Sequence, residues 1–147
     1  MKSRYILLVE DNPDDVDLTL RSFKRNNILN DVVVMKDGAE ALDYLFRKGN
    51  YSARVMGLNP DVVILDIKLP KVSGLDVLKR MRENEDTRYI PVVILTSSKE
   101  EADVVEGYKS GANSYVRKPL NFETFSEAVR QLGLYWLVMN EPLPRME

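Results

Sequence analysis

The residues of this 147-residue chain that could do chemistry share one position, directly after a short apolar run. They are Glu10 and Asp11, Asp66, Thr96 and Ser97, and Lys118 with Pro119. Three carboxylates gathered at one place repel one another, and a bound cation relieves that repulsion. Because the donors are hard oxygens, they favour Mg²⁺ or Mn²⁺ over zinc.

Asp66 is the candidate nucleophile of such a site. A carboxylate can accept a phosphoryl group, and a metal ion can neutralise the charge around it. The Lys118 ammonium and the Thr96 hydroxyl suit the oxygens of the transferred group. Two simpler interpretations remain open: the acids cap the helices that follow them, and Lys118 is a surface lysine.

Two neighbours of Lys118 have alternative interpretations. Tyr115 lies three residues before Lys118 on the same short strand. It either swings between exposed and buried positions as Thr96 moves, or is an ordinary half-buried tyrosine. Pro119 indicates a defined backbone after Lys118 and makes a cis peptide bond conceivable, although spacing alone does not establish one.

Composition excludes several function classes. The chain has no cysteine and no histidine, which rules out thiol catalysis, disulfides and a phosphohistidine on this chain. The formal net charge is −2, and no basic face indicates nucleic-acid binding. The apolar run Tyr5–Val9 is far shorter than the ~20 residues that cross a bilayer. We expect no membrane contact and a cytoplasmic location.

Short apolar runs alternate with amphipathic segments, which predicts strands and helices that position these groups. Strands are expected at residues 5–9, 32–35, 62–65, 90–95 and 114–118, and helices start near residues 13, 37, 73, 98 and 121. Strands that are apolar on both faces are typical of a parallel sheet covered by helices on both sides. The predicted fold is α/β, a single doubly wound sheet. Ligands bind such sheets beyond the carboxyl ends of the strands, where these side chains converge.

Taken together, these residues resemble the receiver domain of two-component response regulators. The resemblance rests on this set with Tyr115, and on the strings ILLVEDNPDD, VVILDIKLPKVSGLDVLKRMR, PVVILTSS and GANSYVRKP. It covers about residues 4–139. It implies a flavodoxin-like fold with strand order 2-1-3-4-5, one receiver domain over residues 1–140, a short tail over 141–147 and no output domain.

The resemblance also implies a role for each residue. Asp66 matches the phosphoacceptor, and Asp11 and Asp66 match direct metal ligands, with Glu10 acting through water and the Lys68 backbone carbonyl as the third protein ligand. Thr96, Ser97 and Lys118 match the phosphoryl-binding groups. Thr96 and Tyr115 match the switch pair, and Pro119 matches a cis proline. Mg²⁺ or Mn²⁺ is the implied cofactor, and the implied phosphodonor is a sensor histidine kinase. The long stretch 47–60 and the apolar ending resemble stand-alone regulators that serve phytochromes.

The last predicted helix carries apolar residues on a second side. Leu134, Leu137 and Val138 project away from the core-facing residues by the arithmetic of 3.6 residues per turn. We expect a homodimer partner to cover them. Alternatively, the tail after Asn140 folds back over them, or Gly133 bends the helix.

Three functions compete for this sequence. The favoured one is a phosphorylation switch that acts by protein–protein interaction and is not an enzyme, apart from its own phosphotransfer and slow autodephosphorylation. A phosphorylation-independent dimeric scaffold with the same fold is the alternative. A phosphatase with an aspartyl-phosphate intermediate is disfavoured because Lys68 stands where its second aspartate would be needed.

Overall fold

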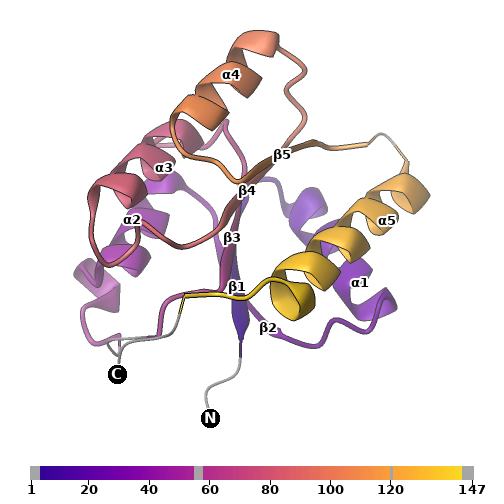
Figure 1. The fold of residues 1–147 in the computed structure, drawn as a ribbon, viewed down its shortest axis with the longest axis horizontal. Coiled ribbons are helices and arrows are strands. Elements are labelled where there is room, and N and C mark those ends of the chain that lie inside the picture. Colours follow the sequence, from indigo (N-terminus) through magenta and orange to yellow (C-terminus); the bar gives the residue numbers. More distant parts are fainter. Residues whose placement is uncertain (1–3, 55–57, 120, 144–147) are drawn as a thin grey trace.

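The structure is a computed structural model that describes residues 4–54, 58–119 and 121–143. Five parallel strands form one sheet in the order β2-β1-β3-β4-β5, with helices on both faces (Figure 1). The strands are β1 Tyr5–Val9, β2 Asp31–Met35, β3 Val62–Leu65, β4 Val92–Thr96 and β5 Ser114–Arg117. The helices are α1 Pro13–Arg25, α2 Gly38–Phe46, α3 Gly74–Glu83, α4 Glu101–Lys109 and α5 Phe122–Gly133, with a 3-10 turn η1 Gly49–Tyr51 and a π-helix η2 Leu134–Met139. The predicted fold class and strand order are confirmed.

The sheet has an apolar core on each face, because successive side chains of a strand point to opposite sides. Ile6 and Leu8 of β1 pack with Phe125 in the core beneath α1 and α5. Leu7 and Val9 pack in the other core, beneath α2 and α3. Burial on both faces explains why the strands are continuously apolar in the sequence.

The start of α1 is fixed by its own sequence directly beyond β1. The Asn12 side chain caps the helix by accepting hydrogen bonds from the backbone N–H groups of Asp14 and Asp15. Pro13 stands in the first turn, where its missing N–H costs nothing. Acidic Asp14 and Asp15 suit the positive end of the helix dipole. The first turn of α1 therefore lies beside the carboxyl end of β1.

Two glycines allow helices to approach the loops beyond the strands. A Cβ at Gly74, the first residue of α3, would lie 1.9 Å from the backbone oxygen of Asp66. A Cβ at Gly38, the first residue of α2, would lie 1.9 Å from the backbone oxygen of Val72. Any larger residue would push these helix starts away from the loop that carries Asp66.

The long segment between α2 and β3 is anchored by Arg54. Its guanidinium donates to the backbone oxygens of Tyr44 (2.8 Å) and Leu45 (3.3 Å), which lie in the last turn of α2. It also donates to the backbone oxygen of Leu58 at 2.6 Å and to the Asn59 side chain at 3.0 Å. Arg54 thereby adds a charged donor to carbonyls in the last turn of a helix, where intrahelical donors run out.

The helix α4 begins later than the sequence predicted. The predicted start lay near residue 98, but the N-cap is Glu100, with no side-chain cap hydrogen bond. The Ser98 hydroxyl donates to the Asp103 carboxylate at 2.5 Å and accepts from the Glu100 N–H at 3.4 Å. The hydroxyl still braces the first turn of the helix, but from outside the helix.

The prediction that Leu137 projects outward was wrong. The α-helix ends at Gly133, and residues 134–139 form a π-helix, whose wider turn shifts the direction of each following side chain. Leu137 is buried in the core beneath α1 and α5, whereas Leu134 and Val138 are exposed, at 42% and 69%. The exposed apolar surface at this end also includes Tyr135 and Met139.

No helix in the described part of the chain combines the length and the apolar character needed to span a membrane.

Candidate functional site

The predicted site residues meet at the carboxyl edge of the sheet. Glu10 follows β1 and its backbone N–H donates to the Met35 oxygen at 3.0 Å. Asp66 follows β3, the neighbour of β1, and its N–H donates to the Val9 oxygen at 3.1 Å. These bonds extend the strand pairing by one residue. The sheet itself therefore fixes where the two acidic residues leave it.

Glu10, Asp11 and Asp66 form one acidic cluster. One carboxylate oxygen of each lies within 4.8 Å of the others, and Glu10 and Asp66 are buried while Asp11 is exposed. Water has access to the cluster from the side of Asp11. Three carboxylates at this spacing, all hard oxygen donors, fit a divalent cation that keeps several of its waters. The predicted convergence of the three acids is confirmed.

The Lys118 ammonium lies against this cluster. Its Nζ atom is 2.5 Å from Glu10 Oε1, 2.8 Å from Asp15 Oδ2 and 3.0 Å from Asp66 Oδ2. Burial disfavours the ammonium, but hydrogen bonds to Asp15 and Glu10 outweigh this and raise the pKa of Lys118 above its ordinary value. Lys118 is therefore a charged, buried group, not the surface lysine of the simpler interpretation.

Glu10 has an unusual protonation equilibrium. Burial raises the pKa of its carboxyl to about 7, and the nearby Asp66 charge adds to the rise, although the hydrogen bond from Lys118 opposes it. The positive charge of Lys118 is not enough to offset the burial of Glu10, so this carboxyl ionises less readily than an exposed glutamate. A second cation in the pocket would supply that charge.

Asp66 is held by several donors. The Thr96 hydroxyl donates to Asp66 Oδ1 at 2.7 Å, and the Lys68 backbone N–H reaches the same oxygen at 3.4 Å. The other oxygen, Oδ2, accepts from Lys118. The Lys118 backbone N–H donates to the Thr96 carbonyl at 2.8 Å, which links the ends of β4 and β5. A carboxylate in this position has both oxygens oriented and a positive charge beside it.

Comparisons with known proteins identify the architecture. The sequence model of the response regulator receiver domain family matches residues 6–130. The chain belongs to the response regulator receiver domain family. As a receiver domain, it works in two-component signal transduction.

Individual relatives show which response regulators this chain is similar to. Response regulator Rcp1 of Synechocystis sp. is 34% identical over 91% of this chain and 89% of its own length. The structure of the phosphorylated cyanobacterial phytochrome response regulator RcpA has a TM-score of 0.90 at 31% identity, covering 97% of this chain and 100% of its own. The bacteriophytochrome response regulator RtBRR has a TM-score of 0.77 at 52% identity, covering 97% of this chain and 86% of its own. This receiver domain is thus close to phytochrome response regulators.

The two residues predicted to form a switch pair, Thr96 and Tyr115, lie on the adjacent strands β4 and β5. Tyr115, on β5, is half-buried, and its hydroxyl donates to the Ser98 backbone oxygen at 3.3 Å. The Ser98 N–H in turn reaches the Thr96 hydroxyl oxygen at 3.5 Å. Thr96 and Tyr115 are therefore connected through one residue. Ser97, between Thr96 and Ser98, is exposed at the pocket edge.

The resemblance implied a cis peptide bond before Pro119, and this expectation was wrong for this structure. Among the described residues no peptide bond is cis, so Lys118 and Pro119 are joined in the trans form. The trans form is the more stable isomer for X–Pro bonds by about 0.5–1 kcal/mol. Lys118 reaches all three of its carboxylates in this form.

Sequence reasoning missed Asp15. It lies in the first turn of α1, four residues after Asp11, and its carboxylate contacts the Lys118 ammonium. We assigned the acids of this segment to strand ends and left the helix that follows out of the site. The available signal was that a helix starting directly after β1 has its first turn at the same edge of the sheet.

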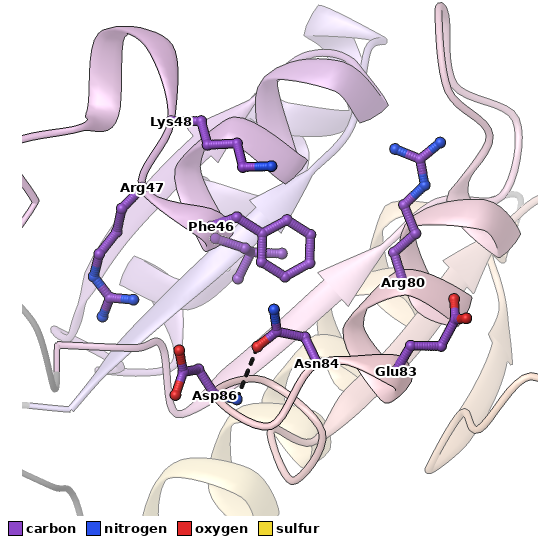
Figure 2. Close-up of a pocket in the computed structure, with 8 residues that line it drawn as sticks. Phe46, Arg47, Lys48, Arg80, Glu83, Asn84 and Asp86 are labelled. Atoms are coloured by element: carbon purple, nitrogen blue, oxygen red, sulfur yellow. Dashed lines mark hydrogen bonds between the residues drawn. The ribbon is translucent and has the colours of Figure 1, made fainter.

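A separate hollow lies away from the receiver pocket, between the ends of α2 and α3 (Figure 2). Its volume is about 380 Å³. Figure 2 shows Phe46 between Lys48 on one side and Arg80 on the other, with Glu83 and Asn84 on the α3 side. The C-terminal ends of α2 and α3 lie at the edge of the sheet opposite the one where Asp66 follows β3. This hollow therefore does not belong to the acidic pocket.

Proposed function

We propose that this receiver is a switch that accepts a phosphoryl group on Asp66 and acts through protein–protein contact. The observation that carries the proposal is the position of Asp66, which lies within one acidic cluster and also accepts hydrogen bonds from Thr96 and Lys118. A nucleophile, a cation site and two donors for phosphoryl oxygens thus occupy one pocket.

The transfer follows from these groups. An Asp66 carboxylate oxygen attacks the phosphorus of a phosphohistidine, a P–O bond forms, and the P–N bond breaks with its electron pair going to the imidazole. Lys118 and Thr96 then have phosphoryl oxygens to donate to, in place of the carboxylate oxygens they contact now. Ser97 is the further phosphoryl-binding group that we propose.

Glu10, Asp11, Asp66 and the Lys68 backbone carbonyl are the groups that would hold Mg²⁺ or Mn²⁺. When bound, the ion neutralises charge on the carboxylates and the phosphoryl oxygens. Support for such a site comes from the acidic cluster and from response regulator Rcp1, whose structure is known in an Mn²⁺-bound form.

The proposed phosphodonor is a sensor histidine kinase, because this chain has no histidine of its own. Similarity to RcpA and RtBRR, which are phytochrome and bacteriophytochrome response regulators, favours a phytochrome as that kinase. We place the protein in the cytoplasm with no nucleic-acid partner. It turns over no separate substrate, and its aspartyl phosphate is lost by slow autodephosphorylation.

A homodimer is the proposed form of the protein–protein contact. Leu134, Tyr135, Val138 and Met139 give the end of the last helix an exposed apolar surface that a second copy would cover. Replacing Val138 by Asp should then shift the molecular mass from dimer to monomer. An unchanged dimer mass in this variant would place the contact elsewhere.

The decisive experiment is phosphorylation by acetyl phosphate with and without Mg²⁺, followed by intact mass and light scattering. We expect wild-type protein to gain one phosphoryl group only with Mg²⁺, and Asp66→Asn to gain none. Asp76→Asn is a matched control, because Asp76 is an exposed aspartate in the first turn of α3. Uptake by Asp66→Asn would refute the assignment. No uptake by any protein would favour the phosphorylation-independent dimeric scaffold.

A further inference from the structure

Lys118 is shared between two kinds of carboxylate. Glu10 and Asp66 belong to the acidic cluster that fits a cation, whereas Asp15 lies outside that cluster. An ammonium has three N–H donors and no acceptor, and here each donor faces one of these carboxylates. Lys118 thus neutralises two of the same groups that a metal ion would use.

A divalent cation in the cluster changes what Lys118 can contact. Metal-bound carboxylate oxygens are poorer acceptors for an ammonium, and the two positive charges repel each other. Lys118 must nevertheless stay in the pocket to serve the phosphoryl group. It therefore needs a partner that the cation does not use.

Asp15 meets this requirement by its place in the fold. Its backbone is held from both sides: its N–H donates to the Asn12 side chain at 3.3 Å, and its carbonyl accepts from the Thr19 hydroxyl at 2.7 Å. Its side chain is 27% exposed, compared with 10% for Asp66, so it reaches toward Lys118 from the open side of the pocket. A carboxylate on a fixed backbone, outside the acidic cluster, can keep the ammonium in place.

We propose that Asp15 is a positioning residue that retains the Lys118 ammonium when a divalent cation occupies the acidic cluster of Glu10, Asp11 and Asp66. The proposal rests on the proposed function, since it requires metal and phosphoryl group to share this pocket. Without Asp15, Lys118 would keep competing with the cation for the cluster. Metal affinity should therefore fall, although Asp15 is not itself a ligand.

A double-mutant cycle tests this assignment. Mg²⁺ and Mn²⁺ affinities would be measured by titration calorimetry for wild type, Asp15→Asn, Lys118→Met and the double variant. Asp14→Asn is the matched control, because it removes the same charge from the same helical turn and Asp14 makes no ion pair with Lys118. Thermal melting would be recorded for every variant, so that affinity is compared only between folded proteins.

We expect Asp15→Asn to weaken Mg²⁺ binding by about tenfold, a normal coupling for groups in direct contact, and Asp14→Asn to change it less than about twofold. In the Lys118→Met background the Asp15 effect should disappear, and Asp15→Glu should restore most of the affinity. An equal loss in both backgrounds would show that Asp15 acts directly on the ion and would overturn the proposal. Unchanged affinity in Asp15→Asn would also overturn it. Wild-type protein that binds no metal would instead refute the proposed cation site.

Discussion

Replacing Gly74 by alanine should test whether the start of α3 sets the position of Asp66. A Cβ there would lie 1.9 Å from the Asp66 backbone oxygen and 2.9 Å from its carbonyl carbon. Ordinary van der Waals contact begins at 3.4 Å, so the helix start and the loop must separate by about 1.5 Å. Both contacting atoms belong to the backbone, so no side-chain rotation can relieve the overlap.

This displacement has two measurable consequences. Forcing atoms into a packed site costs about 1–3 kcal/mol, and the better helix propensity of alanine returns at most about 1 kcal/mol. At about 2–4 °C per kcal/mol for a chain of this size, the melting temperature should fall by several degrees. Because misplacing a reacting group by about 1 Å can cost about 100-fold in rate, phosphorylation should slow much more than stability alone explains.

The assay combines unfolding in urea with the rate of phosphorylation by acetyl phosphate under conditions where both proteins are folded. Gly133→Ala is the matched control. Its Cβ would lie 2.2 Å from the Cδ1 atom at the end of the flexible Ile28 side chain, far from the pocket. It should lower stability and leave the phosphorylation rate unchanged. A wild-type rate in Gly74→Ala would refute the idea that this glycine positions Asp66.

Three further predictions follow from the structure. Because the pKa of Glu10 is raised to about 7 by burial, the folded state holds a proton that the unfolded state releases near pH 4.5, so this group's contribution to stability falls as the pH rises from 4.5 to 7. Urea unfolding should show the free energy of unfolding of Glu10→Gln rising relative to that of wild type by up to about 3 kcal/mol between pH 4.5 and pH 7. A difference that stays constant with pH would contradict the raised pKa. Arg54→Ala should lower the free energy of unfolding by about 2–3 kcal/mol, because the backbone oxygens of Tyr44 and Leu58 each lose a charged donor, and should leave the rate of Asp66 phosphorylation unaffected. Leu137→Ala should lower the free energy of unfolding of the monomeric protein by about 2–5 kcal/mol, and Val138→Ala by less than about 0.5 kcal/mol, because only Leu137 is buried. The reverse order would contradict the π-helix and support a continuous α-helix.

The sequence by itself determined the sheet and most of the pocket. Continuous apolar runs predicted buried parallel strands, and parallel strands bring their carboxyl ends to one edge. This rule predicts that Glu10, Asp11, Asp66 and Lys118 lie at one edge of the sheet. Strand periodicity is robust because each strand is short and buried on both faces, so small errors in its ends leave its direction unchanged.

The errors arose where local geometry depends on packing. The buried side of Leu137 follows from a π-helical turn, and the arithmetic of 3.6 residues per turn applies only while the α-helix continues. The helix predicted to start near residue 98 begins at Glu101, and the Ser98 hydroxyl instead donates to Asp103 in its first turn. Such choices are decided by competing partners that are brought together only when the chain has folded.

Tertiary structure alone decided the charge balance of the pocket. Sequence spacing could list the carboxylates, but the distances of 2.5–3.0 Å from Lys118 to Glu10, Asp15 and Asp66 depend on how α1 and β5 approach across the sheet. The same holds for the pKa of Glu10, which is raised by burial that no local pattern encodes. Electrostatic energies depend on separation and on exclusion of water, and both are set by contacts between segments distant in the sequence.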